Sequence, residues 1–156
     1  MHPARLVIVC GPPGAGTTQR AELLAERFAA TRMEPEGWME RLGFGLGDVG
    51  ARRRIERIQS DLTIDLLRLG ANVVAASGTT QRTERDHLRG RAIGVGALVH
   101  LEFVDAPIGV AWSETIECPT PDELATYDPM PPVSAGDRPG SASFPYGSWL
   151  PQSRPR

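Results

Sequence analysis

The chain has 156 residues, a formal net charge of −2 and a pI near 5.9. This length favours one domain with a sizeable hydrophobic core over two independent cores. The near-neutral charge balance argues against nucleic acid or an anionic membrane as the partner, because both are usually bound by a strongly basic surface. All 17 basic residues are arginine, so the sequence contains no lysine.

The cysteines and the apolar runs predict a soluble, cytoplasmic protein with reduced thiols. Cys10 and Cys118 lie far apart and do not have the pattern of a disulfide framework. The apolar run at residues 6–10 is too short for a signal sequence or a membrane span. No later run reaches the roughly 18 apolar residues that a membrane-spanning helix needs.

The first predicted elements are a strand, a glycine-rich loop and a helix. Residues 6–10 are a continuous, mostly β-branched run that is typical of a central parallel strand, and residues 11–16 follow as a turn. Apolar residues at positions 21, 24 and 28 share one helical face, which predicts a helix over 17–31. A short edge strand is expected over 33–36, since Pro35 cannot donate a ladder hydrogen bond.

The elements that follow continue the alternation of helices and strands. Helical spacing predicts a helix over 48–69, which Asp48 would cap. Further elements are expected as strands over 72–76 and 97–104, and as helices over 83–93 and 107–116. The connections are long enough for parallel pairing. This order predicts an α/β fold, a three-layer αβα arrangement around a mostly parallel sheet.

The composition changes after Cys118. Residues 119–156 are rich in proline, serine and glycine and have no periodic apolar pattern. Such a segment gains too little burial to offset the entropy of ordering it. We therefore expect one domain over residues 1–118 and a largely extended or disordered tail over 119–156.

Residues 11–18, GPPGAGTT, match the phosphate-binding loop pattern G-x-x-x-x-G-K-[ST] except at the lysine, where Thr17 stands. The glycines allow backbone conformations in which amides face an anion at the start of a helix. The predicted nucleotide-binding residues are Gly11, Gly14, Ala15, Gly16, Thr17 and Thr18. The Thr18 hydroxyl is also the candidate ligand for Mg²⁺.

The missing lysine affects binding and catalysis differently. A neutral threonine cannot neutralise charge on the β and γ phosphates as the transferred group moves. Nucleotide binding should therefore survive better than catalysis, because losing one charged contact of this kind costs roughly 10³ or more in rate. The alternative is a tight strand-to-helix turn that binds no ligand.

Several segments, in the same order along the chain, resemble bacterial P-loop kinase-like ATP-binding proteins, which carry the AAA-family ATPase label. The segments are LVIVCGPPGAGTT (6–18), EPEGWME (34–40), VVAASGTTQRTERDHLR (73–89), LEFVDAP (101–107) and PTPDELATYD (119–128). The resemblance covers about residues 5–128. It implies a P-loop NTPase fold and transfer of a phosphoryl group from ATP with Mg²⁺ to a hydroxyl of a small-molecule acceptor.

The departures from this family fall where chemistry is expected. Relatives carry lysine where this chain has Thr17, commonly an acid where it has Ala76, and arginine after the VDAP match, whereas residues 107–127 contain no basic residue. Glu36 stands where relatives usually have an aspartate that acts as a base or orients an acceptor hydroxyl. Arg82 is the candidate compensating cation; the alternative is that it lies on a solvated helix face.

The resemblance and its departures leave three functions open. The first is an ATP-binding P-loop protein of the small-molecule kinase type, with catalysis impaired by Thr17 and with Glu36 and Arg82 as its catalytic residues. The second is a catalytically inactive nucleotide-binding or regulatory module. The third is a scaffold that binds no nucleotide. In none of them is a nucleic acid or a membrane the expected partner. The run Arg52 to Arg54 is interpreted as part of a mixed, solvated helix face.

Overall fold

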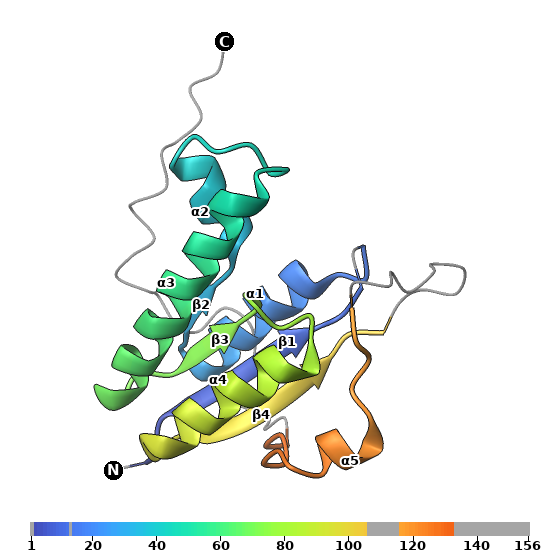
Figure 1. Ribbon diagram of the computed structural model, residues 1–156. Coiled ribbons are helices and arrows are strands. Elements are labelled where there is room, and N and C mark those ends of the chain that lie inside the picture. The colour runs from blue at the N-terminus through green and yellow to red at the C-terminus, as the bar shows by residue number, and fades with distance from the viewer. Residues whose placement is uncertain (1, 13, 106–115, 133–156) are drawn as a thin grey trace.

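The computed structural model describes residues 2–12, 14–105 and 116–132. Their helices and strands follow the chain (Figure 1) as β1 (Arg5–Cys10), α1 (Thr17–Phe28), β2 (Thr31–Met33), α2 (Pro35–Arg41), α3 (Val49–Arg68), β3 (Val73–Ala75), α4 (Arg82–Gly94), β4 (Leu98–Phe103) and α5 (Pro121–Leu124). This element order confirms the predicted α/β fold. Within the described ranges, no helix is both long enough and apolar enough to cross a membrane.

The four strands form one parallel sheet in the order β2-β3-β1-β4. β1 is central: it pairs with β3 on one side and, along its whole length from Arg5 to Cys10, with β4 on the other. This position explains its continuous apolar run, because side chains on both faces of β1 are buried. All four carboxyl ends lie at the same edge of the sheet, where α/β proteins usually bind ligands.

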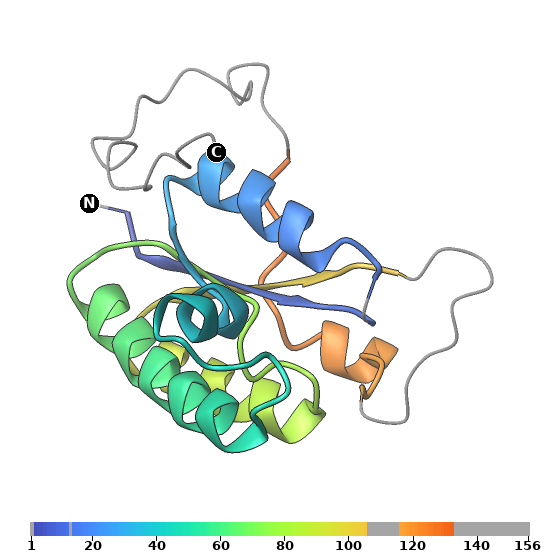
Figure 2. The ribbon, with the colours of Figure 1, turned by 90° about the horizontal axis from the view of Figure 1, so that it is seen from above.

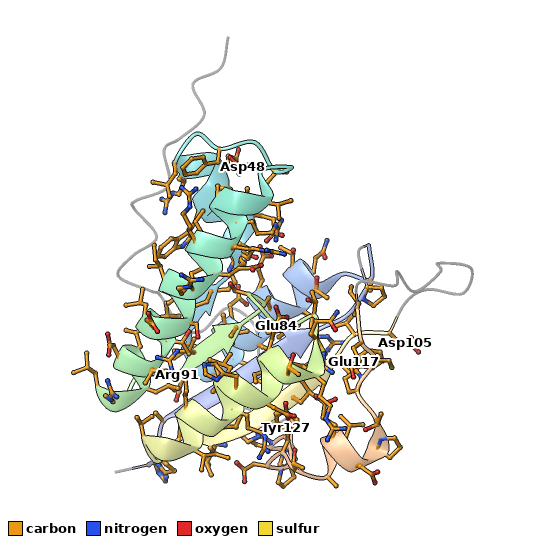
Figure 3. All side chains as sticks on the ribbon, in the orientation of Figure 1. Asp48, Glu84, Arg91, Asp105, Glu117 and Tyr127 are labelled. Atoms are coloured by element: carbon orange, nitrogen blue, oxygen red, sulfur yellow. The ribbon has the colours of Figure 1, made fainter. Side chains whose placement is uncertain are left out.

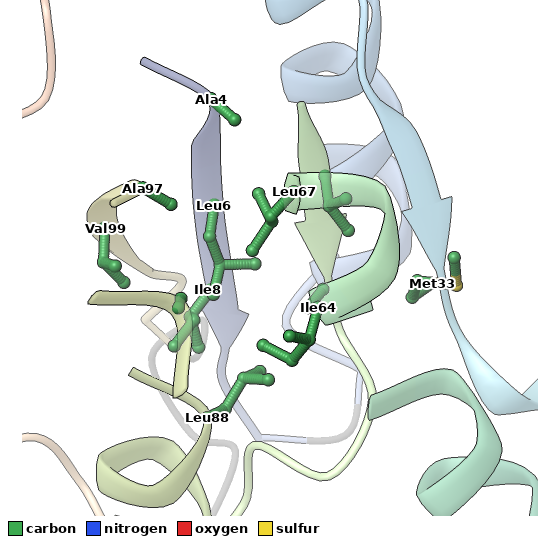
Figure 4. Close-up of a cluster of buried hydrophobic side chains, with 12 residues drawn as sticks. Ala4, Leu6, Ile8, Met33, Ile64, Leu67, Leu88, Ala97 and Val99 are labelled. Carbon is green, nitrogen blue, oxygen red and sulfur yellow. The ribbon is translucent and has the colours of Figure 1, made fainter. Parts of the chain in front are cut away.

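Helices cover both faces of the sheet, which gives the three expected layers (Figure 2). Leu6 and Ile8 of β1 point to the face covered by α3 and α4, and they pack in the cluster shown in Figure 4. Val7 and Val9 point to the opposite face, which α1 covers. This split follows from the two-residue period of a strand. Each fully buried aliphatic side chain contributes roughly 1.5–3 kcal/mol, so β1 is a firm base for the loop that follows it.

The region after β2 differs from the expectation. The strand ends at Met33, and the edge strand predicted over 33–36 is wrong in its position, because Pro35 instead begins helix α2. Proline suits the first helical turn, since its missing N–H would have no intrahelical partner there. The fully buried Met39 anchors α2 against α3.

The folded domain continues past residue 118. Within 119–132, Thr120 caps α5 and Glu123 is fully buried. The expected boundary at 118 is therefore too early, since composition alone did not reveal this burial. Residues 133–156 and nearly all of the helix expected over 107–116 lie outside the described residues.

Asp128 joins this C-terminal segment to the free edge of β4. Its backbone amide donates to the Val99 carbonyl at 2.8 Å, and its carboxylate accepts from the Val99 amide, also at 2.8 Å. The segment thereby satisfies backbone groups that an edge strand would otherwise expose. Residues 116–132 are consequently a part of the domain that can contribute to a site.

Candidate nucleotide-binding site

The glycine loop connects the carboxyl end of β1 to the amino end of α1. Gly14 and Gly16 have φ angles of 79° and 90°, in the left-handed region that favours glycine. Gly16 directly precedes α1, whose amino end has no side-chain cap and no acidic residue in its first turn. The partial positive charge at this end of the helix is therefore left for an anion.

Gly11 lets the loop pack closely against the end of β4. A Cβ at this position would contact the backbone carbonyl of Val104 and would lie 3.0 Å from the Thr17 Cγ2. The Val104 amide also donates to the Cys10 carbonyl at 2.9 Å, which ties the two strand ends together. The base of the loop is thus fixed by packing with no space for a larger residue.

The loop amides divide into two groups. The Ala15 amide donates to the Pro12 carbonyl at 3.1 Å, so a bond inside the loop already uses it. Among the described residues, no acceptor is found for the amides of Gly14, Gly16 and Thr17. In this conformation the donors available to an anion therefore come from Gly14, Gly16 and the first turn of α1, whereas the Ala15 amide would first have to release Pro12.

The loop opens onto a cleft of about 450 Å³, within the usual size range of small-molecule sites. The cleft is lined by the end of β1, the loop, α2, α3, the β3–α4 connection and Ile116. Of the residues predicted at the site, Gly11, Thr17 and Glu36 line this cleft together. Ala76 also lines the cleft, so that position offers no carboxylate.

Among the described residues, three charged side chains line the cleft: Glu36, Arg52 and Glu56. The Arg52 Nη2 donates to the Glu36 Oε1 at 2.8 Å, and its Nη1 lies 3.8 Å from the Glu56 Oε1. Burial raises the pKa of Glu56, and the nearby Arg52 only partly offsets this effect. One guanidinium faces two carboxylates, so Arg52 does not restore the positive charge lost at Thr17. Arg52 lines the cleft, whereas the run Arg52 to Arg54 was expected on a mixed, solvated helix face.

Five residues expected at the site, Gly14, Ala15, Gly16, Thr18 and Arg82, are not among the described residues that line the cleft. Thr18 is exposed and is not among the residues that line the cleft. Arg82 also lies outside that lining, and its Nε is 3.5 Å from the Asp86 Oδ2, one helical turn away. This i,i+4 spacing on an exposed first turn favours a local ion pair over a reach into the cleft.

The described side chains of the cleft do not form a set of metal ligands. Its carboxylates, Glu36 and Glu56, face Arg52, and Thr18 is outside the lining. Among the described residues, no group of three or more His, Cys, Asp or Glu side chains is placed to hold a metal. The residues present therefore do not make a complete Mg²⁺ site.

Cys10 lines the cleft but is not a reactive thiol. Burial raises its pKa to about 11, although the charge of Arg85 acts in the opposite direction. A thiol with this pKa stays protonated near neutral pH and is a poor nucleophile. Covalent chemistry through Cys10 is therefore not part of what this cleft can do.

The sequence patterns missed the contribution of the β3–α4 connection. Thr79 and Thr80 line the cleft, and the Thr79 hydroxyl donates to the Val9 carbonyl at 2.9 Å. Arg85 is fully buried behind them, and no role was predicted for it from the sequence. A signal was present, because Arg85 precedes Leu88 by three residues and so shares the inner face of α4.

Comparison with known proteins agrees with this architecture. The model of the AAA domain family matches residues 6–114, and the chain belongs to this family. No curated protein matches the sequence. Solved structures of P-loop small-molecule kinases share the fold, which confirms the expected resemblance.

Three solved structures illustrate the likeness. The APS kinase of Mycobacterium tuberculosis in complex with AMPPNP and APS has a TM-score of 0.54 and 17% identity, over 69% of this chain and 66% of that one. A chain of the Pnkp1/Rnl/Hen1 complex has a TM-score of 0.58 and 17% identity, over 87% and 43%. The hexameric APS kinase from Thiobacillus denitrificans has a TM-score of 0.51 and 19% identity, over 64% and 22%. This chain thus spans less than half of the last two, and at these identities the likeness establishes the fold.

Proposed function

We propose that this member of the AAA domain family binds ATP, with the polyphosphate against the amino end of α1. The observation that carries the proposal is the uncapped helix end at Gly16, with a φ of 90°, beside a cleft that Thr17 lines. Backbone amides and the helix dipole attract an anion without any side-chain charge. The kinase-like fold, seen in one neighbour together with AMPPNP, supports the choice of nucleotide.

The reaction that fits this cleft is phosphoryl transfer from ATP to a hydroxyl of a small acceptor. Glu36 is the proposed base, because it lines the same cleft as Thr17. The Arg52 contact at 2.8 Å orients its carboxylate but also competes for the oxygen that would accept the proton. With Thr17 in place of lysine, we expect this transfer to be slow.

Mg²⁺ enters the proposal as a companion of the nucleotide. When bound to ATP, the ion supplies charge neutralisation of the phosphates. Thr18 remains the candidate protein ligand from the sequence, but it is exposed outside the cleft lining, and Ala76 has no ligating atom in its side chain. We therefore assign no step of the reaction to an ion held by this chain.

A catalytically inactive nucleotide-binding module is the second candidate function. Three features favour it: the neutral Thr17, the Ala76 side chain in the cleft, and the excess of carboxylates around Arg52. All three weaken the stabilisation of a transition state more than they weaken the amide contacts. In such a module, nucleotide binding would be retained without turnover.

Titration with ATP·Mg²⁺, together with measurement of phosphate release, separates the two functions. The proteins to compare are the natural chain, Thr17→Lys, and the control Gln19→Lys, which adds the same charge at an exposed position of the first turn of α1. Binding by the natural chain, with turnover only after Thr17→Lys, supports the inactive module. Turnover by the natural chain supports a kinase. Absence of heat and of any thermal shift in both the natural chain and Thr17→Lys would contradict nucleotide binding.

A further inference from the structure

A buried ion pair lies behind the cleft, outside the glycine loop. The Arg85 Nε is 2.6 Å from the Glu123 Oε1, the Arg85 Nη2 is 2.9 Å from the Glu123 Oε2, and the two side chains are 0% and 1% exposed. Burial alone lowers the pKa of Arg85, but its hydrogen bonds to Glu123 and nearby negative charge outweigh that effect and raise it. Arg85 therefore stays charged within the protein.

Attachment of α5 to α4 does not by itself require this pair. Desolvation of two charges is costly, and apolar side chains of similar volume often hold two elements together equally well. What apolar side chains lack is direction, because they cannot hold backbone carbonyls at fixed angles and distances. The remaining contacts of Arg85 are directional hydrogen bonds to backbone carbonyls.

Arg85 holds the cleft wall from behind. Its Nη1 donates to the carbonyls of Thr79 and Thr80 at 3.0 Å and 3.2 Å. Both threonines line the cleft, and the Thr79 hydroxyl in turn donates to the Val9 carbonyl at the end of β1. One guanidinium thus connects Glu123 directly to a wall of the cleft.

The C-terminal segment meets the same wall from the outside. Ile116 lines the cleft, and the next residue, Glu117, donates its amide to the Thr80 carbonyl at 2.8 Å. The Glu117 carboxylate accepts from the Arg82 amide at 3.0 Å, and Figure 3 shows this side chain beside the first turn of α4. The Thr80 carbonyl therefore receives donors from both Arg85 and Glu117.

We propose that Arg85 and Glu123 are positioning residues that couple the docking of residues 116–124 to the shape of the cleft. The pair fixes Thr79 and Thr80 on one side and the segment that carries Ile116 on the other. Loosening it displaces both walls while the glycine loop stays intact. The choice of ATP as the ligand in the first test below rests on the proposed function.

The first test compares ATP affinity at a temperature where every variant is folded. Glu123→Gln keeps the size of the side chain but removes its charge, and Leu67→Ala destabilises the buried core on α3 without touching the cleft. We expect Glu123→Gln to weaken ATP binding about tenfold or more, because small displacements of positioned groups are costly. Leu67→Ala should bind as the natural chain does. Equal affinities for both variants would overturn the proposal.

The second test needs no nucleotide. Hydrogen exchange in the full chain should speed up at the amides of Arg82 and Glu117 in Glu123→Gln, relative to other amides, because both donate across the coupled walls. Leu67→Ala should produce no such local change, and unchanged local exchange in Glu123→Gln would overturn the positioning role. Failure of the natural chain to bind ATP would contradict the proposed function, while this exchange would still decide the positioning role.

If Glu123→Gln does not fold, Glu117→Ala tests the contact of residues 116–124 with the wall of the cleft instead. Glu117 is exposed, and its truncation removes the carboxylate contact to the Arg82 amide without opening the buried pair. Weaker ATP binding, with faster exchange at the Arg82 amide, is the expected result. Unchanged exchange at that amide would contradict coupling between residues 116–124 and the wall of the cleft.

Discussion

The Arg52 guanidinium, on α3, donates to the Glu36 carboxylate, on α2, at 2.8 Å. The contact joins the two helices at the cleft and fixes the carboxylate proposed as the base. The same contact makes Glu36 a weaker base. The Glu36 oxygen that accepts a hydrogen bond from Arg52 has to give up this bond before it can accept the proton of the acceptor hydroxyl. The activity of Glu36 is therefore best measured in a protein whose loop carries the missing charge.

In the Thr17→Lys background, Glu36→Gln should lower phosphoryl transfer by roughly 10²–10⁴, the usual contribution of a general base. ATP affinity should change little, because the amides at the start of α1 remain. Glu40→Gln, an exposed change on the same helix, serves as the control. Turnover and calorimetric affinity are the two readouts; equal turnover of Glu36→Gln and Glu40→Gln would exclude Glu36 as the base.

Glu56→Gln should raise the free energy of unfolding near neutral pH. Burial raises the pKa of Glu56 in the folded protein, so folding favours the protonated form and disfavours the charged form. The stability linked to this group is present at low pH and is lost as the pH rises through the raised pKa. The advantage of the variant should thus shrink as the pH falls through the raised pKa, and it should be gone below the ordinary carboxyl value of 4.5.

Urea unfolding of the natural chain and the variant, at neutral and at acidic pH, checks the sign. Glu26→Gln, at an exposed position of α1, controls for the general loss of one negative charge. A lower stability of Glu56→Gln at neutral pH, or an advantage that grows on acidification, would contradict the assigned role of burial.

The buried pair gives a third prediction. Glu123→Ala should destabilise the fold by about 3–5 kcal/mol, because it leaves the Arg85 charge buried without its partner. The double change Arg85→Met with Glu123→Leu should recover most of this loss, since two apolar side chains need no such compensation. Denaturant unfolding of the two variants measures the difference. A double variant less stable than Glu123→Ala would show that the charged pair itself holds the fold.

The two cysteines should differ in reactivity. Cys10 is buried, with a pKa raised to about 11, whereas Cys118 is exposed. A thiol reagent near neutral pH should therefore modify Cys118 in the folded protein and reach Cys10 only after denaturation. Mass spectrometry of the labelled peptides identifies the site, and Cys118→Ser is the control. Rapid labelling of Cys10 in folded Cys118→Ser would mean that the base of the cleft opens to solvent.

The parts of the fold that depend on local pattern could be predicted from the sequence. The run Leu6 to Cys10, the glycines of the loop and the apolar stripe of α3 each specify their element within a few residues. Helix α2 was missed because residues 33–36 were interpreted as a short strand that Pro35 restricts to an edge, although proline followed by Glu36 also suits a first helical turn. The local sequence is compatible with a strand and with a helix, and the packing of α2 on α3 favours the helix.

The walls of the cleft depend on contacts between distant residues. Glu123 meets Arg85 across 38 positions, and Asp128 meets Val99 across 29, so composition gave no sign that the segment is ordered. Thr120 with Pro121 and Glu123 does form a helix-start pattern that could have placed α5. Thr17 could be placed in the glycine loop from the pattern alone, whereas the ion pair of Arg82 with Asp86 was not anticipated.

The central claim is that backbone amides at the start of α1 bind polyphosphate without a lysine. Amide chemical shifts of isotope-labelled natural protein, followed as ATP·Mg²⁺ or pyrophosphate is added, test it most directly. We expect saturable shifts at Gly14, Gly16, Thr17 and Thr18, which precede or begin the helix. Saturable shifts confined to residues away from this turn, or no shifts at these four amides at millimolar ligand, would contradict it.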